Sequence, residues 1–273
     1  MHTLHALLMI VLFAASAHAG TISYSDPAGD DFGPGKYKYP IDAVYKRGSF
    51  DLRGVEIRDR GSVVEFRVAL NQRIEDPWDS RSWQPKGNGF SVQLIQIYLD
   101  RDHKPGSGFT KTLPGVNARF KPADAWDRVV FISPQGAGQV KSQVKLQAGK
   151  MARAVVVPIK VKIRGRKIIA TVKKSALGGA PKASWGVQVV VGSSDGYAGG
   201  KSLFSRKVNE YAGKHLFGGG SNHNCDPHVM DILAGQGQGQ ASEILAQKKA
   251  LAYTCGAGGQ AVKWATLPML RKK

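Results

Sequence analysis

Short segments in which apolar and polar residues alternate dominate the chain. Residues 63–70 and 91–99 place an apolar side chain at nearly every second position, the pattern of a strand with one buried face. Further apolar runs are predicted as strands at residues 129–132, 140–146, 154–163, 168–172 and 185–191. Arg164-Gly165-Arg166, between two of these runs, indicates a hairpin turn.

One segment, residues 242–253, has helical spacing, because Ile244, Leu245, Lys248 and Leu251 recur at intervals that share a helical face. Many short strands and one short helix predict an all-β fold, a single β-sandwich over residues 20–217. Glycine-rich stretches follow residue 217. We therefore expect residues 218–273 to form a short C-terminal helical extension that closes onto the sandwich.

The N-terminus has the features of an export signal. Residues 7–15 are apolar but too few to span a bilayer, and Ala17-His18-Ala19 is a small-x-small cleavage site. We predict a signal peptide at residues 1–19 and a secreted protein, either periplasmic or extracellular. The alternative is a buried N-terminal helix. No later stretch reaches 18 apolar residues, so no transmembrane span is expected.

The chain has two cysteines, Cys225 and Cys255. In an exported protein such a pair is expected to form a disulfide, which stabilises the fold by about 3–4 kcal/mol on the chain-entropy model. The alternative is a metal site, since His223, Asp226 and His228 lie close to Cys225 in the sequence.

Several motifs carry a family resemblance. The first comprises residues 26–40, which begin Asp-Pro-Ala-Gly-Asp-Asp, together with Gly48-Ser49-Phe50-Asp51-Leu52. The second comprises Asp76-Pro77-Trp78, residues 87–100 and residues 113–118. The third comprises residues 216–220 and 229–233.

These motifs resemble the C-terminal module of glucodextranases and of bacterial or archaeal amylopullulanases. That module is a DOMON-like β-sandwich of immunoglobulin-like or jelly-roll type, related to family 9 carbohydrate-binding modules. The resemblance implies a non-catalytic, surface-associated module that binds sugar. Catalytic domains usually precede this module, and we expect the present chain to act without one.

The acidic residues of the first motif are candidate calcium ligands. Asp26, Asp30 and Asp31 lie in a Gly/Pro-rich turn and Asp51 follows downstream. Hard cations bind several carboxylate oxygens on a bent backbone, and the related modules often carry structural calcium. The alternative is that these residues only stabilise turns.

Exposed aromatic rings are the expected contacts for sugar faces. The candidates are Trp83, Trp78, Trp126, Tyr37 and Tyr197, all in loops or Gly-rich turns. The alternative for each ring is a place in the core.

The formal net charge is +19, and residues 128–194 contain no Asp or Glu. Lys160, Lys162 and Arg164 alternate with apolar residues, and Arg166 and Lys167 extend the charge around the predicted hairpin. Such a face attracts anionic polymers of the cell envelope, whereas nucleic acid is not an expected partner of an exported protein. The alternative is a solvated edge that blocks strand pairing.

Signals of an enzyme are weak. Gly192-Ser193-Ser194-Asp195-Gly196 matches G-x-S-x-G, but the residues that follow do not favour the helix that a nucleophile elbow needs. We therefore predict a non-enzymatic, carbohydrate-binding protein of the cell envelope or of extracellular glucan. The alternative is an adhesion or scaffold protein that binds anionic envelope polymers without a sugar pocket.

Overall fold

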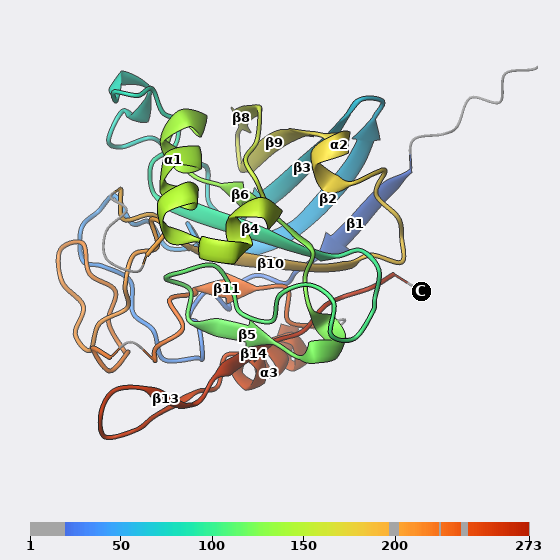
Figure 1. Ribbon diagram of the computed structural model, residues 1–273. Coiled ribbons are helices and arrows are strands. Elements are labelled where there is room, and N and C mark those ends of the chain that lie inside the picture. The colour runs from blue at the N-terminus through green and yellow to red at the C-terminus, as the bar shows by residue number, and fades with distance from the viewer. Residues whose placement is uncertain (1–19, 197–201, 224, 236–239, 273) are drawn as a thin grey trace, which may run out of the picture.

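The structure is a computed structural model that describes residues 20–196, 202–223, 225–235 and 240–272. Two five-stranded sheets form the body of the molecule (Figure 1). The first sheet has the order β1 (Thr21–Ser25), β2 (Leu52–Arg60), β3 (Val63–Leu70), β9 (Lys167–Lys173), β8 (Lys160–Arg164). The second has the order β11 (Asp231–Ile232), β10 (Gly186–Ser193), β4 (Gln93–Asp100), β6 (Arg128–Ile132), β7 (Val155–Val156).

The first sheet is antiparallel throughout, and in the second only the β6–β7 pair is parallel. Smaller strand pairs and helices surround the sheets. They are β5 (Ala118–Phe120) with β14 (Ala265–Leu267), β12 (Thr254–Cys255) with β13 (Ala261–Lys263), α1 (Ala137–Gln147), α2 (Lys174–Leu177), α3 (Gln240–Ala250), and the 3₁₀ turns η1 (Ser80–Ser82), η2 (Pro122–Asp124) and η3 (Gly149–Ala154). The predicted mostly-β, two-sheet architecture is confirmed. The specific immunoglobulin-like or jelly-roll topology stays a prediction.

Two hydrophobic clusters hold the fold together. The first lies between the sheets and includes Phe66 and Ile97. The second covers the other face of the second sheet, where Tyr98 and Phe131 pack against Leu251 and Leu267 of the C-terminal segment. Every residue of β4 and β10 is buried as a result. The C-terminal segment thus contributes to a core that the sheet cannot complete alone, and the domain boundary at residue 217 stays a prediction.

The prediction of a strand at residues 140–146 is wrong, because these residues belong to helix α1. Val140 and Val144 are buried and lie four residues apart, so both face the second sheet from one side of a helix. Leu146 would share a strand face with Val144, yet it is 73% exposed. The spacing of Val140 and Val144 fits a strand as well as a helix. The segment is a helix because it packs across the surface of the second sheet.

The predicted strand at residues 154–163 is divided in two. Its first part is β7 in the second sheet, and its second part is β8 at the edge of the first sheet. Pro158 lies in the connection, where a residue without an N–H fits because the chain leaves one ladder for another. The predicted hairpin is confirmed: Arg164 pairs with Lys167, and Gly165 has a φ of +58° at the turn.

The predicted C-terminal helix is confirmed as α3, but its buried face differs from the expected one. Glu243 and Gln247 are buried, whereas Leu245 is 65% exposed. A disulfide joins Cys225 and Cys255, whose Cα atoms lie 5.7 Å apart, as predicted. Among the described residues, no helix combines the length and the apolar character that crossing a membrane requires.

Candidate functional site

Carboxyl groups from distant parts of the sequence converge at one end of the sandwich. Asp26 directly follows β1, Asp51 directly precedes β2, and Asp30 lies in the turn after Asp26. Asp231 begins β11, and Glu243 projects from the first turn of α3. All five side chains are buried. Carboxylate oxygens of Asp26, Asp30 and Asp231 lie within 4.8 Å of one another. We call this set the acidic cluster.

Backbone hydrogen bonds fix the acidic cluster in place. The amide of Gly29 donates to Asp51 Oδ2 at 2.8 Å, and the amide of Leu52 donates to Asp231 Oδ2 at 2.6 Å. The amide of Ala234 donates to Glu243 Oε1 at 3.0 Å. These contacts orient three of the carboxylates and join the turn, β11 and α3.

Gln247, one helical turn after Glu243, ties the same parts together. Its side-chain amide donates to the carbonyl of Asp30, and its Oε1 accepts the amide of Ile232 at 2.9 Å. The buried face of α3 is therefore polar, because Glu243 and Gln247 form hydrogen bonds with the segments that carry the acidic cluster.

Several oxygens of the acidic cluster have no hydrogen-bond donor among the described residues. They are both carboxylate oxygens of Asp26, both of Asp30, one of Asp51 and one of Glu243. Burying a charged oxygen without a partner costs several kcal/mol, so buried carboxylates are normally paired with a cation or protonated. These oxygens fit a bound metal ion, and hard cations such as Ca²⁺ take six to eight oxygen ligands.

The electrostatics agree with this fit. Burial, reinforced by the neighbouring carboxylates, raises the pKa of Asp26 to about 10. Burial and the neighbouring Glu243 raise the pKa of Asp30 to about 9. Burial likewise raises the pKa of Asp231 well above its usual value, and that of Asp51 to about 6. Without a cation, the acidic cluster would hold protons at neutral pH.

The structure changes the predicted ligand set. Asp26, Asp30 and Asp51 belong to the acidic cluster, but the carboxylate of Asp31 accepts a hydrogen bond from the hydroxyl of Tyr39. Tyr39 therefore orients Asp31, whose role as a metal ligand stays a prediction. Asp231 and Glu243 were missed. Asp231 lies within a family-like motif, an acidic residue flanked by Val229, Met230, Ile232 and Leu233, which is a signal that could have found it.

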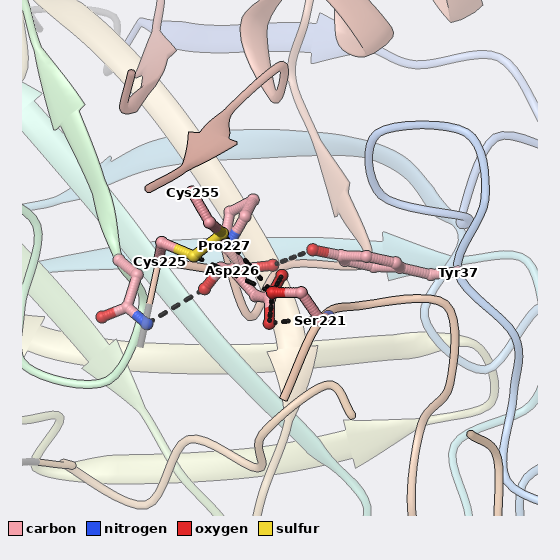
Figure 2. Close-up of a disulfide and its surroundings, with 7 residues drawn as sticks. Tyr37, Ser221, Cys225, Asp226, Pro227 and Cys255 are labelled. Carbon is pink, nitrogen blue, oxygen red and sulfur yellow. Dashed lines mark hydrogen bonds between the residues drawn. A yellow bond between two sulfur atoms is a disulfide. The ribbon is translucent and has the colours of Figure 1, made fainter. Parts of the chain in front are cut away.

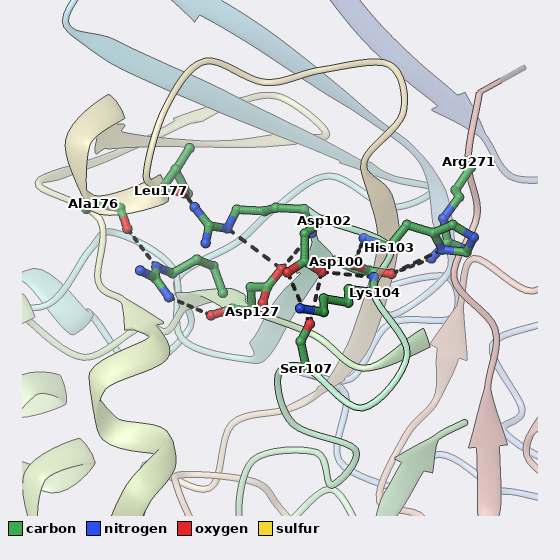
Figure 3. Close-up of polar contacts among 11 residues, drawn as sticks. Asp100, Asp102, His103, Lys104, Ser107, Asp127, Ala176, Leu177 and Arg271 are labelled. Carbon is green, nitrogen blue, oxygen red and sulfur yellow. Dashed lines mark hydrogen bonds and ion pairs between the residues drawn. The ribbon is translucent and has the colours of Figure 1, made fainter. Parts of the chain in front are cut away.

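A second acidic group, Asp100, Asp102 and Asp127, is chemically different (Figure 3). Arg271 forms ion pairs with Asp100 and with Asp124, and the amide of Arg101 donates to Asp127 Oδ2 at 2.8 Å. Asp102 accepts the hydroxyl of Ser107 at 3.0 Å. Arginine and backbone donors already compensate these carboxylates, so their arrangement is accounted for as structural.

The disulfide also lies in a polar network (Figure 2). Ser221 donates its backbone amide and its hydroxyl to the carboxylate of Asp226. The Tyr37 hydroxyl donates to the carbonyl of Pro227 at 2.9 Å. The alternative metal site around Cys225 is wrong, since both thiols are in the disulfide and His228 Nδ1 accepts the amide of Val208 at 3.1 Å.

The aromatic candidates for sugar binding differ in how far their rings are exposed. Trp126 is 0% exposed and Tyr37 is 2% exposed, so neither ring has a face free for a sugar. The Trp126 indole N–H donates to the carbonyl of Lys111 at 2.9 Å, deep in the second cluster. For these two residues the core alternative holds. Tyr197 lies outside the described residues.

Trp83 and Trp78 remain partly exposed and are linked. The Trp83 indole N–H donates to the Trp78 carbonyl at 2.9 Å, while the Trp78 ring packs edge-on against Tyr45. The loop between them is rigid because the Asp76 carboxylate accepts both the amide and the hydroxyl of Ser80. Trp78 therefore anchors the loop, and Trp83 is its more available ring.

A further aromatic site, which the sequence analysis missed, surrounds Trp264. This ring directly precedes β14, whose parallel pairing with β5 brings it beside Arg119. The Arg119 guanidinium lies 4.3 Å from the centre of the partly exposed Trp264 ring. Together with Lys111 and Asn117 they line a shallow groove of about 150 Å³. The guanidinium covers one face of the indole, so a sugar ring would stack on the opposite face, with the polar groups of the groove at its edge.

The basic strand is located as expected from its pattern. Lys160, Lys162 and Arg164 are exposed on the outer face of β8, while Val161 and Ile163 pack against the inner cluster. Arg166 is exposed at the hairpin turn, and Lys167 pairs with Glu56 at 3.2 Å. Since β8 is the outer strand of the first sheet, its cations also protect a sheet edge.

The serine motif lacks the geometry of a nucleophile elbow. Ser194 is 0% exposed and forms a bridge with Ser205 at the end of β10. An acylating serine must expose its hydroxyl above the sheet, so this serine is not suited to that role.

A family model described as the C-terminal binding module, SLH-like, of glucodextranase matches residues 22–266. The chain belongs to this family. The resemblance drawn from the motifs is thereby confirmed, and the family is a binding module of a glucan-degrading enzyme. A comparison with curated proteins gives no match. The matched range contains the whole acidic cluster, Trp83 and Trp264.

Proposed function

We propose that this protein is a secreted, non-catalytic, carbohydrate-binding module that acts at the cell envelope or on extracellular glucan. The observation that carries this proposal is membership of the glucodextranase C-terminal binding-module family over residues 22–266. The disulfide between Cys225 and Cys255 supports an oxidising, extracytoplasmic location.

The acidic cluster is proposed to hold one structural Ca²⁺ ion. Asp26, Asp30 and Asp231 would supply central oxygens, with Asp51 and Glu243 beside them. An ion at this point would join the first turn, β11 and α3, which lie far apart in the sequence. Calcium is favoured over magnesium because Ca²⁺ accepts six to eight protein oxygens in a variable geometry, whereas Mg²⁺ usually keeps several of its waters and is rarely enclosed by buried carboxylates alone.

The sugar is proposed to stack on an exposed indole ring. Trp83 and Trp264 are the two candidates, since both are partly exposed and both are held by fixed neighbours. The polar groups that would orient the sugar differ: Arg81 lies in the loop of Trp83, and Lys111 and Arg119 lie beside Trp264.

A glycan array at low and high salt tests the proposal. We expect salt-resistant binding to a neutral α-glucan, lost by at least tenfold in Trp83→Ala or in Trp264→Ala. Tyr211→Ala is the matched control, because Tyr211 is 74% exposed and lies outside both candidate sites. Absence of binding to any neutral glycan in the presence of calcium would contradict the proposal.

A second candidate function rests on the basic strand β8. Lys160, Lys162 and Arg164 form no ion pair with an acidic residue in the described part of the chain, so their charge is available to an anionic partner. This supports an adhesion or scaffold role on anionic envelope polymers. Binding to many polyanions that disappears at high salt would favour this role over a sugar pocket.

A further inference from the structure

A groove of about 460 Å³ lies between α1, β7 and the end of the first sheet. Its floor is apolar and includes Val144 from α1, Val156 from β7 and Ile159 from the connection to β8. Ile159 is 54% exposed, so the groove presents one large aliphatic side chain to a partner. The groove is large enough to accept part of a small ligand.

Three lysines surround this floor. Lys141 and Lys145 lie four residues apart on α1 and so share one helical face, and Lys173 ends β9 on the opposite wall. All three are exposed, and none forms an ion pair with an acidic residue that the structure describes. No Asp or Glu lines the groove.

The lysines of the groove continue into the basic strand. In the β8–β9 ladder Lys160 pairs with Thr171, and Lys173 lies two residues further along the same outer face of β9. Lys160 also directly follows Ile159. The groove and β8 thus form one surface, with apolar residues at its centre and lysines and arginine around them. This positive surface is complementary in charge to a phosphate headgroup.

We propose that this groove is a lipid-docking site that receives an anionic phospholipid at a membrane surface. Hydrocarbon packs mainly on the exposed Ile159, above a floor that the buried Val144 and Val156 complete, and the headgroup phosphate lies among Lys141, Lys145 and Lys173. A purely polyanionic partner needs the lysines but gains nothing from the apolar floor. A neutral apolar partner needs the floor but leaves the lysines unused. An anionic amphiphile satisfies both, and each lysine near an anionic lipid surface adds to the attraction.

Co-sedimentation with vesicles tests this site. We expect the protein to bind vesicles of phosphatidylglycerol and phosphatidylcholine in a 3:7 ratio, and not vesicles of phosphatidylcholine alone. The double variant Lys141→Glu/Lys145→Glu should bind at least tenfold more weakly. Ile159→Ser should bind about threefold or more weakly, and its defect should grow at high salt, where the apolar contact contributes a larger share.

Matched controls separate the site from general charge. Lys104→Glu/Lys121→Glu makes the same charge change at exposed positions outside the groove, and Ile41→Ser removes an isoleucine that is 76% exposed elsewhere. Both should bind like the parent protein. Thermal unfolding of each variant verifies that it is folded.

Three results would overturn the proposal. They are no binding of the parent protein to the anionic vesicles, equal losses in the control and groove variants, and unchanged vesicle binding by Ile159→Ser with full competition by soluble polyphosphate. The last result would assign the surface to anionic polymers. Neutral-glycan binding is a separate measurement, so failure of the lipid site leaves the proposed carbohydrate role unaffected.

Discussion

At the scale of single residues, Asp26 and Asp30 are the strongest evidence for a cation site. Both carboxylates are buried, and the charged group that acts most strongly on each of them is another carboxylate, that of Glu243. Such groups destabilise a fold unless a cation neutralises them. Asp102, which is exposed and hydrogen-bonded, is a contrasting case in the same molecule.

Replacing Asp30 by asparagine should change stability in opposite directions with and without calcium. In chelator at neutral pH, Asp30→Asn should raise the free energy of unfolding by about 1–2 kcal/mol, because the amide is neutral without the proton that buried Asp30 must take up on folding. With calcium, the same variant should bind the ion about tenfold or more weakly, because a charged ligand is lost. Thermal unfolding and calorimetric titration measure both effects.

Asp102→Asn serves as the control for that experiment. It should leave calcium affinity unchanged, since its carboxylate belongs to the second acidic group. If Asp30→Asn destabilised the protein equally in chelator and in calcium, the metal assignment of the acidic cluster would be wrong.

The raised pKa values also predict how the metal-free protein responds to pH. Asp26, with a pKa of about 10, and Asp30, with a pKa of about 9, bind protons in the native state that the unfolded chain has released above pH 3.8. Because the native state then holds more protons, the free energy of unfolding should fall as pH rises from 7 to 9. Unfolding in chelator at pH 7, 8 and 9 measures this trend.

Calcium should reverse the proton balance, since the ion binds the ionised carboxylates and releases their protons. Titrations in buffers of different ionisation enthalpy count the protons released. The pH window lies above the range in which His228 matters: burial lowers its pKa to about 4, so it destabilises the fold only at acidic pH, where the unfolded chain binds the proton. Stability that stays constant from pH 7 to 9 in chelator would contradict the predicted shifts.

At the scale of elements, α3 and β11 belong to one closed loop. The disulfide joins residues 225 and 255, and this loop contains both Asp231 and Glu243. The covalent bond therefore limits how far two members of the acidic cluster can separate in the unfolded chain. The helix buries Glu243 and Gln247 toward the cluster and exposes Leu245, so its position depends on polar contacts.

Opening this loop should weaken both the fold and the calcium site. The double variant Cys225→Ser/Cys255→Ser should lose about 3–4 kcal/mol of unfolding free energy, from the entropy of the released loop. Its calcium affinity should also fall, because Asp231 and Glu243 must be ordered at the same time as the ion binds. Asp30→Asn in the same background distinguishes the two effects, since it removes a ligand that lies outside the loop.

At the scale of the whole molecule, the +19 charge is unevenly arranged. Residues 128–194 contain no acidic residue and supply β8, β9 and α1, whereas the acidic cluster draws on residues before 52 and after 230. The surface around β8 is therefore strongly positive, although three carboxylates of the same sheet form ion pairs beside it: Glu56 with Lys167, Glu65 with Arg67 and Asp59 with Lys174.

This polarity predicts strongly salt-dependent binding to polyanions. Lys160→Glu/Lys162→Glu/Arg164→Glu should reduce binding to polyphosphate by at least tenfold at low salt, and both proteins should bind weakly at about 0.5 M salt because screening is then short-ranged. Lys86→Glu/Lys104→Glu/Lys121→Glu has the same net charge and is the control. Equal losses in the two triple variants would mean that net charge, and not the β8 surface, determines binding.

The local features of the fold could be predicted from the sequence alone. Alternation located β3, β4 and β9, placed Lys160 and Lys162 on the solvent side of β8, and identified the hairpin at Gly165. The motifs identified the family, and the two cysteines indicated the disulfide. These features depend on residues that are close together in the sequence, so their spacing can be read directly from it.

Tertiary structure decided what covers each surface. A helix at 137–147 replaces the expected strand because the second sheet is buried on both faces and needs a layer above it. The same burial removes Trp126 from the solvent. Asp231 and Glu243 join Asp26 only through the packing of β11 and α3, contacts that span about two hundred positions and leave no period in the sequence. Periodicity reports which side of an element is buried, but the partner that buries it is fixed by the fold.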